Sequence, residues 1–252
     1  ALEQELVPPV LAVEPHRGWW LSRDAGPVLR SVAPPDQLWH AWEAILLRYA
    51  EAQLRLAGKV DALLSTGVAE VSPATLPELA GTLLKRLGEM SPEKGGLTAA
   101  EQEALAGRLS EYAAWCAELE ASGIPSSIQH DDLHSSNICS GGSADTARII
   151  DWGDASVGFP LATMLCTMNS LAWHARVELD DPRVVRVRDA YLEPFTRFAD
   201  RESLVRYVGL ARRTGCVARA LSYEAALREE PLATHVEQDF PVRGWLLEML
   251  AD

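Results

Sequence analysis

The chain has 252 residues, of which 48% are hydrophobic and 23% are charged, and its net charge is −13. The length allows a sizeable core in one large domain or two small ones, and the composition is ordinary for a globular protein. The acidic balance argues against nucleic acid as a partner, because binding phosphate groups needs a basic surface. An acidic cleft would attract a cationic small molecule, although a merely solubilising surface explains the charge equally well.

The cysteines and the absence of long apolar runs indicate the compartment that the sequence predicts. Four cysteines are scattered without a C-x-x-C pair, so they indicate thiols in a reducing compartment rather than a disulfide framework. No signal peptide opens the chain, and no apolar run reaches the roughly 18 residues that a membrane span needs. The sequence therefore predicts a cytoplasmic protein without a membrane partner, and it does not indicate an oligomeric state.

A β-hairpin is the first predicted element. Val10–Val13 and Trp19–Ser22 are short apolar runs separated by Glu-Pro-His-Arg-Gly, which is typical of a turn. Residues 24–27, Asp-Ala-Gly-Pro, then interrupt the strand pattern.

Helical spacing governs the chain from Pro35 onward. Apolar side chains recur at helical intervals as far as Leu56, with Asp36 as the predicted N-cap. After a looser segment and a second helix, Thr98 and Glu101 form a capping box that opens a third helix. The predicted helices in this part cover residues 38–56, 73–87 and 98–121.

Further helices are predicted after residue 160. Residues 158–160, Gly-Phe-Pro, predict a turn, and an apolar helix is predicted after it over Leu161–Ala175. The next helix begins at Asp181 and breaks at Pro194, because proline removes a backbone donor. One or two further helices are predicted over residues 201–227, and a last helix is predicted over residues 242–250.

The stretch Gln129–Gly153 holds the clearest chemical signal. Asp132 and Asn137 lie five residues apart within H-D-D-L-H-S-S-N, and Asp151 ends the apolar run of I-I-D-W-G. Turn residues between them predict a β-hairpin of 137–139 with 147–150, which brings Asp151 back toward Asn137. Two carboxylates and one amide at this spacing suit phosphoryl transfer, which needs oxygen ligands for Mg²⁺ and a carboxylate beside the acceptor hydroxyl.

The same stretch matches the protein-kinase signature, H-R-D-L-x-x-x-N followed by Asp-Phe-Gly, at His130, Asp132, Leu133, Asn137, Asp151 and Gly153. His134, Trp152 and Asp154 resemble the aminoglycoside phosphotransferase family within the kinase-like superfamily that includes choline kinases, which reads H-G-D-L-H-x-x-N and I-D-W-x-[DE]. The resemblance runs from about Leu6 to the C-terminus, and Asp131 replaces the usual glycine. It implies an α+β, protein-kinase-like fold with a mostly helical C-terminal lobe, a catalytic β-hairpin and a remnant of the N-terminal sheet.

The resemblance also implies roles for individual residues. Asp132 is the expected catalytic base, and Asn137 and Asp151 are the expected magnesium ligands. Backbone groups near Ser22 and Asp24, in the hinge after the N-terminal sheet, are expected to hydrogen-bond adenine. The expected cofactors are ATP or GTP and Mg²⁺, and the expected substrate is a small molecule with a hydroxyl group.

Several nearby residues allow two readings. His130 and His134 are expected to support the site through their rings, and Asp154 either contacts substrate or caps a turn. A zinc site from His130, Asp132 and His134 is an alternative by composition, but a cysteine or third histidine at ligand spacing is missing. Candidate residues for lining the substrate pocket are Trp173, His174, Tyr223, Glu224 and Asp239, with Arg212 and Arg213 either holding substrate or pairing with acids.

The glycine-rich loop and strand lysine that bind phosphates in such kinases have no counterpart here. No G-x-G-x-x-G occurs, and Lys59, Lys85 and Lys94 lie downstream of the hinge. We expect either a fragment, inactive by itself, or a member that has lost phosphate binding, with a remnant of the nucleotide-binding lobe and the hinge over 1–26 and the catalytic and substrate lobe over 27–252. The alternatives are a pseudokinase or binding module and, less favoured, a hydrolase using the same metal site.

Overall fold

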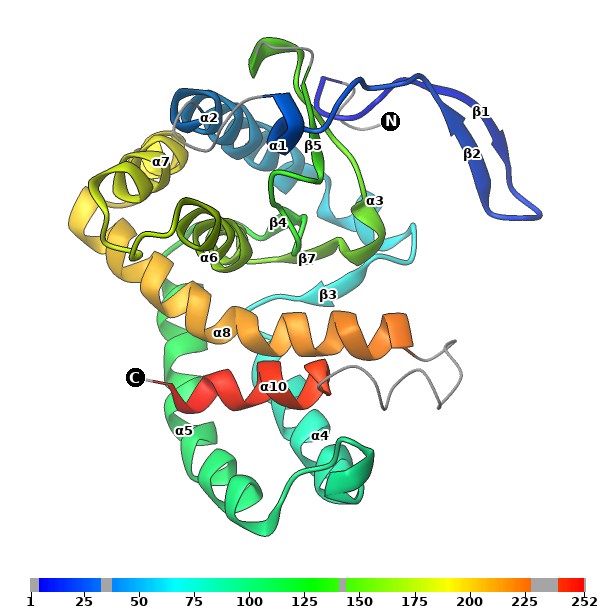
Figure 1. Ribbon diagram of the computed structural model, residues 1–252. Coiled ribbons are helices and arrows are strands. Elements are labelled where there is room, and N and C mark those ends of the chain that lie inside the picture. Colours follow the sequence, from blue (N-terminus) through cyan, green and yellow to red (C-terminus); the bar gives the residue numbers. More distant parts are fainter. Residues whose placement is uncertain (1–4, 33–37, 141–143, 228–239, 252) are drawn as a thin grey trace.

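The computed structural model describes residues 5–32, 38–140, 144–227 and 240–251. Helices make up most of this part of the chain, and three small sheets lie among them or project from them (Figure 1). The α+β class with a mostly helical body, expected from the sequence, is confirmed. No helix in the described ranges is both long and apolar enough to cross a membrane.

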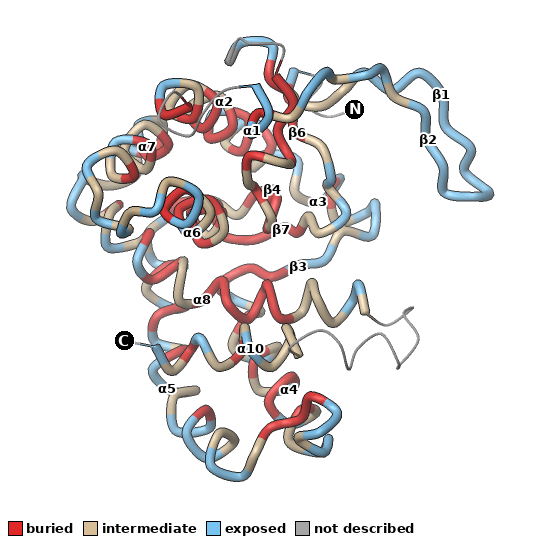
Figure 2. Tube along the Cα trace, in the orientation of Figure 1, coloured by how far each residue is buried: buried red, intermediate tan, exposed pale blue. Residues whose placement is uncertain are grey.

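The predicted N-terminal hairpin is confirmed as β1 (Val10–Glu14) and β2 (Trp19–Ser22), which pair antiparallel. Gly18 adopts φ 65° in the connecting turn, a conformation that glycine reaches without steric cost. The hairpin projects from the helical body (Figure 1), and almost all of it is exposed (Figure 2). Its exposed apolar side chains are Val10, Leu11, Val13, Trp19, Trp20 and Leu21.

The helical body begins with the short α1 (Leu29–Val32) and the long α2 (Trp39–Leu56), which packs against α7 (Pro182–Leu192). The predicted N-cap Asp36 lies outside the described residues, and Leu38 precedes α2 without a side-chain cap. After α2 come a 3-10 turn and α3 (Val60–Leu64). The inward face of α2 is buried at helical spacing, as predicted, by Trp42, Ile45, Leu46 and Tyr49.

Below α2 lie α4 (Leu76–Gly88) and α5 (Ala99–Ala121), which pack against each other (Figure 1). The predicted start of α4 at residue 73 was wrong by three residues, because residues 72–76 close a turn through hydrogen bonds to the Ser72 carbonyl. The capping box of α5 is confirmed: the Thr98 side chain accepts from the Glu101 N–H, and the Glu101 carboxylate accepts from the Thr98 N–H.

The late helices are α6 (Met164–Ala175), α7, α8 (Arg201–Leu227) and α10 (Pro241–Leu247). The predicted break at Pro194 is confirmed, because α7 ends at Leu192 and a 3-10 helix follows. Residues 201–227 form a single continuous helix, along which α10 packs (Figure 1).

Short strands flank the H-D-D-L-H-S-S-N and I-I-D-W-G motifs. The predicted hairpin is confirmed as β5 (Ile138–Cys139) paired with β6 (Arg148–Ile149). A second sheet that the sequence did not predict has the order β3-β7-β4, with β3 (Ala69–Val71) parallel and β4 (Ser127–Gln129) antiparallel to β7 (Ser156–Gly158). Its strands have three residues each, which is too short for an alternating hydrophobic signal.

Gln53 on α2 ties this sheet to the core. Its side-chain amide donates to the Ile128 carbonyl at 2.9 Å and accepts from the Tyr191 hydroxyl at 2.7 Å. Its backbone carbonyl accepts from the Ser127 hydroxyl at 2.6 Å. Because these groups are buried and hydrogen-bonded, they fix β4, after which the H-D-D-L-H-S-S-N motif begins.

Candidate active site

The loop after β4 is anchored at its first residue. The backbone N–H of His130 donates to the Tyr49 hydroxyl on α2 at 3.0 Å. The buried His130 ring lies 2.7 Å, Nε2 to O, from the Ile150 carbonyl and contacts the Trp152 ring edge-on at 4.8 Å. Burial lowers the pKa of His130, so its ring is neutral and Nε2 is the donor to this carbonyl. His130 therefore links the loop that carries Asp132 to the strand that leads to Asp151.

The Asp132 carboxylate lies among three polar side chains. Its Oδ1 accepts from Arg219 Nη2 at 3.1 Å and from the Cys166 thiol at 3.2 Å. Its Oδ2 lies 3.4 Å from His134 Nε2. The hydrogen bond from His134, followed by the charge of Arg219, lowers the pKa of Asp132 far below its usual range, against the opposing effect of burial. Asp132 is therefore a fixed, ionised carboxylate.

Arg219 on α8 is a residue of this site that the sequence did not single out. Arg219 as a whole is 4% exposed, and its guanidinium also donates to Asp154 Oδ2 at 3.1 Å. The Tyr223 and Trp245 rings lie 4.9 and 5.8 Å from the guanidinium carbon. The available sequence signal was a lone cation within the apolar stretch of residues 215–221, because an unpaired charge is rarely buried.

Asn137 and Asp151 are brought near each other by the β5–β6 hairpin. The Ile150 N–H donates to the Asn137 carbonyl at 2.9 Å, so the residue before Asp151 is bonded to Asn137. The Asn137 side-chain NH₂ donates to the Asp132 carbonyl at 3.0 Å, which directs its amide oxygen elsewhere. Asp151 is exposed and has left-handed backbone angles, φ 62° and ψ 56°, at the end of the hairpin.

These two side chains fit a magnesium ion by their chemistry. An amide oxygen and a carboxylate are hard-oxygen ligands, and Mg²⁺ takes few protein ligands alongside water and phosphate. The described residues hold no group of three or more His, Cys, Asp or Glu side chains arranged for a metal ion. A metal held by Asn137 and Asp151 would therefore depend on phosphate oxygens to complete its shell.

A cavity of about 590 Å³ opens beside the catalytic loop. It lies between residues 66–71 at β3, residues 152–156 leading into β7, and one face of α8. Asp154 and Asp131 both line it. Asp131 is 7% exposed and accepts a short hydrogen bond from the Ser156 hydroxyl, and burial raises its pKa to about 6.

Most of the chain matches a known protein family. The model of the phosphotransferase enzyme family, abbreviated APH, matches residues 7–204. The chain belongs to this family. No curated protein matches it. The kinase-like family expected from the motif residues is thereby confirmed.

Three solved structures show the same fold as this phosphotransferase. The choline/ethanolamine kinase family protein from Mesorhizobium loti is 17% identical with a TM-score of 0.55, over 98% of this chain and 76% of its own. Aminoglycoside 2'-phosphotransferase-IIIa, solved with GDP, is 18% identical with a TM-score of 0.56, over 97% and 77%. Ethanolamine kinase from Plasmodium vivax is 15% identical with a TM-score of 0.55, over 99% and 67%.

The expected hinge of this phosphotransferase lies against the catalytic hairpin. Val28 forms an isolated bridge with Cys139 on β5, and the Ser140 N–H donates to the Pro27 carbonyl at 3.0 Å. The Asp24 carboxylate accepts from the Gly26 N–H at 2.8 Å, while Ser22 pairs with the other strand of its hairpin. Pro27 and Val28 thus join this segment to the β5–β6 hairpin, and no contact in the described structure joins Ser22 or Asp24 to Asp132.

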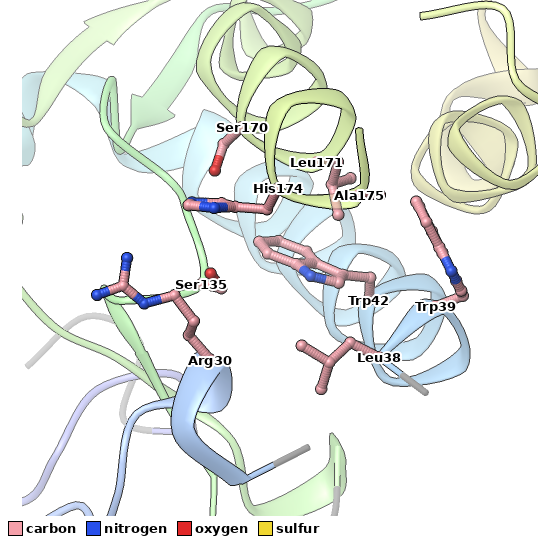
Figure 3. Close-up of a pocket in the computed structure, with 9 residues that line it drawn as sticks. All are labelled: Arg30, Leu38, Trp39, Trp42, Ser135, Ser170, Leu171, His174 and Ala175. Atoms are coloured by element: carbon pink, nitrogen blue, oxygen red, sulfur yellow. The ribbon is translucent and has the colours of Figure 1, made fainter. Parts of the chain in front are cut away.

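Most of the other candidate lining residues lie elsewhere. His174 lines a separate pocket of about 30 Å³, which has room for roughly one water. Figure 3 shows its ring near Arg30 and Ser135, opposite Trp42. Trp173 is 80% exposed. The contacts of the remaining candidates are Glu224 with Arg86, Tyr223 with Arg219, Arg212 with Asn169 and Arg213 with the Trp115 ring, and Asp239 lies outside the described residues.

Proposed function

We propose that the chain is the catalytic part of a small-molecule kinase, which transfers the terminal phosphoryl group of ATP or GTP to a hydroxyl group. The observation that carries the proposal is the ionised Asp132 carboxylate, on a loop whose preceding residue, Asp131, lines a cavity large enough for a small molecule. Membership of the phosphotransferase family supports it, and so does the GDP bound in one solved relative.

Asp132 would orient the acceptor and take its proton. The acceptor oxygen attacks the terminal phosphorus, the bond from that phosphorus to the bridging oxygen breaks, and the hydroxyl proton passes to Asp132 and then to water. A carboxylate with a lowered pKa is a weak base, but the transition state of this reaction is loose and asks mainly for positioning. Arg219 and His134 supply that positioning by contacting opposite oxygens of Asp132.

Asn137 and Asp151 would hold Mg²⁺, whose bound charge neutralises the phosphate oxygens. Backbone groups near Ser22 and Asp24 would bind the nucleotide base from the hinge. In this proposal residues 1–26 belong to the nucleotide-binding lobe and residues 27–252 to the catalytic and substrate lobe. The exposed apolar β1–β2 hairpin supports the first part, because a two-stranded ribbon with exposed faces is normally completed by further packing.

A binding module without catalysis is the second candidate. The placement of the three lysines favours this candidate. Lys59 and Lys94 lie in 3-10 turns, and Lys85 lies on α4. None of them lies on a strand, which is where kinases place the lysine that binds the phosphates. This candidate predicts nucleotide binding without turnover.

The test replaces Asp132 by Asn in the complete gene product. Transfer from radiolabelled ATP or GTP to a panel of hydroxyl acceptors should fall by orders of magnitude, because the acceptor is no longer oriented. Nucleotide affinity, measured by calorimetry with Mg²⁺, should change little. Arg206→Ala, at an exposed ion pair with Glu118, is the control for loss of charge far from the site. Undiminished turnover in Asp132→Asn would refute the role of Asp132, and absence of turnover in the unaltered protein would favour the binding module.

A further inference from the structure

The Arg219 guanidinium contacts Asp132 through a single hydrogen bond. Its Nη2 donates to Asp132 Oδ1 and its Nη1 donates to Asp154 Oδ2, both at 3.1 Å, so each carboxylate receives one bond rather than a paired fork. Two single bonds to different acids leave the guanidinium free to rotate about the line that joins them. Arg219 also reaches the site on a long side chain with many rotamers. Its contact with Asp132 is therefore well placed only if further groups hold the guanidinium.

Two aromatic rings supply this constraint. The Tyr223 ring, one turn further along α8, has its centroid 4.9 Å from the guanidinium carbon, and the Trp245 ring on α10 has its centroid 5.8 Å from it. Both distances lie within the range of a cation–π contact, which is stronger where the cation is out of water. Arg219 is buried, and its Nε has no hydrogen-bond partner in the described structure. Ring contacts rather than a third hydrogen bond therefore complete its surroundings.

The helix that carries Trp245 is itself fixed to the body of the protein. α10 packs along α8 (Figure 1), and Leu246, next to Trp245, is buried. Arg243, two residues before Trp245, forms an ion pair with Glu101 at the start of α5, with 2.7 Å between Nη2 and Oε1. Because α10 is anchored in this way, the Trp245 ring has a fixed position from which to hold the guanidinium.

The two oxygens of the Asp132 carboxylate depend on different partners. Oδ2 lies 3.4 Å from His134 Nε2. Oδ1 accepts from the Cys166 thiol at 3.2 Å and from Arg219. A thiol is a weak donor, whereas a guanidinium is permanently charged. Arg219 therefore fixes Oδ1, and a guanidinium that moves would let the carboxylate turn away from the orientation that His134 and Arg219 together give it.

Resting on the kinase function proposed above, we propose that Tyr223 and Trp245 are positioning residues for phosphoryl transfer. With Asp132 and Asp154 their rings form a cage that fixes the Arg219 guanidinium, and the fixed guanidinium orients the Asp132 carboxylate toward the acceptor hydroxyl. The last helix, α10, thus takes part in the reaction although it lies far from the motif in the sequence. Sequence reasoning had weighed Tyr223 for lining the substrate pocket and had given Trp245 no role.

The first experiment removes the guanidinium and offers a free one. Arg219→Ala keeps both rings and both carboxylates of the cage, so methylguanidinium chloride should bind there and raise the melting temperature, because a ligand of the folded state stabilises it. Methylammonium chloride at the same concentration lacks the planar donors and should raise it less. The unaltered protein, whose cage is filled, should not distinguish the two salts. Adding Trp245→Leu to Arg219→Ala should weaken methylguanidinium binding by about 10-fold.

The second experiment measures phosphoryl transfer by the complete gene product. Trp245→Leu should lower kcat by about 10-fold and leave the KM for the nucleotide unchanged, because the cage acts on Asp132 and not on nucleotide binding. Trp245→Phe, which keeps a ring, should recover most of the rate. Methylguanidinium should restore part of the turnover of Arg219→Ala, but not that of the double variant. The matched control is Phe198→Leu, which removes a ring 4.8 Å from the exposed Arg197 and should leave kcat unchanged.

The proposal is overturned if methylguanidinium stabilises Arg219→Ala no more than methylammonium does, or if Trp245→Leu lowers kcat no more than Phe198→Leu. Should Arg219→Ala fail to fold, the comparison of Trp245→Leu with Trp245→Phe decides, and equal rates in these two variants overturn the proposal. Failure of the kinase function is distinguishable, because the unaltered protein would then show no transfer even where methylguanidinium binds the empty cage. Transfer that Trp245→Leu leaves unchanged would overturn the role of the rings alone.

Discussion

Asp131→Asn should make the folded protein more stable at neutral pH. Burial raises the pKa of Asp131 from 3.8 to about 6, so the folded protein holds an ionised carboxylate at a free-energy cost that the unfolded chain does not have. The difference between these pKa values, at about 1.36 kcal/mol per unit, corresponds to about 3 kcal/mol near pH 7. Asparagine cannot ionise, and its amide oxygen still accepts from the Ser156 hydroxyl.

The sign of this effect depends on pH. Because the folded-state pKa of Asp131 is raised, its stabilising contribution is present below about 3.8 and is lost as the pH rises through about 6. The advantage of the variant should therefore shrink to about half near pH 5. The pKa values of Asp132 and Glu101 are lowered in the folded protein, so the stability that these two carboxylates contribute is lost toward acid pH. Both residues are present in the unaltered protein and in Asp131→Asn, so their contributions cancel when the two proteins are compared.

Urea unfolding of both proteins near pH 7 and pH 5, followed by circular dichroism, measures the difference. Asp61→Asn, an exposed acid on α3, controls for the change of one net charge. A variant that is less stable than the unaltered protein near pH 7, or a difference that does not depend on pH, would refute the reasoning.

Two further perturbations test the core and the hairpin. Gln53→Leu leaves the buried Ile128 carbonyl without its donor, so we expect a loss of about 1–3 kcal/mol in urea unfolding, and unchanged stability would contradict the role given to Gln53. The double replacement Trp19→Ser and Trp20→Ser removes aromatic rings that are exposed in the described structure, so the melting temperature should stay unchanged. A clear fall in melting temperature would mean that these rings pack in the folded protein.

The parts of the fold that the sequence predicted depend on short-range chemistry. The capping box of Thr98 and Glu101 and the break at Pro194 act within one helical turn. The β5–β6 hairpin follows from turn residues between two short apolar runs. In each case the residues that decide the structure lie within about a dozen positions of one another, so their pattern is visible without knowledge of the fold.

The sheet β3-β7-β4 escaped prediction for the opposite reason. Ala69 pairs with Ser156, and Ser127 pairs with Gly158, so each strand is defined by a partner distant in the chain. Three residues carry no period of their own, and a local pattern cannot distinguish such a strand from a loop. The contact of Arg219 with Asp132 was missed likewise, since it spans 87 positions.

Charge balance across the folded site, rather than position in a motif, decides which acid has a cation as its partner. Asp154 follows Asp151, the expected metal ligand, and its own expected substrate contact stays a prediction, because it lines the cavity while paired with Arg219. Asp131 stands where the resembled motif has glycine, and the one nearby cation is already shared by its neighbours. A buried acid without a cation is costly to keep, and this cost is what Asp131→Asn is expected to remove near pH 7.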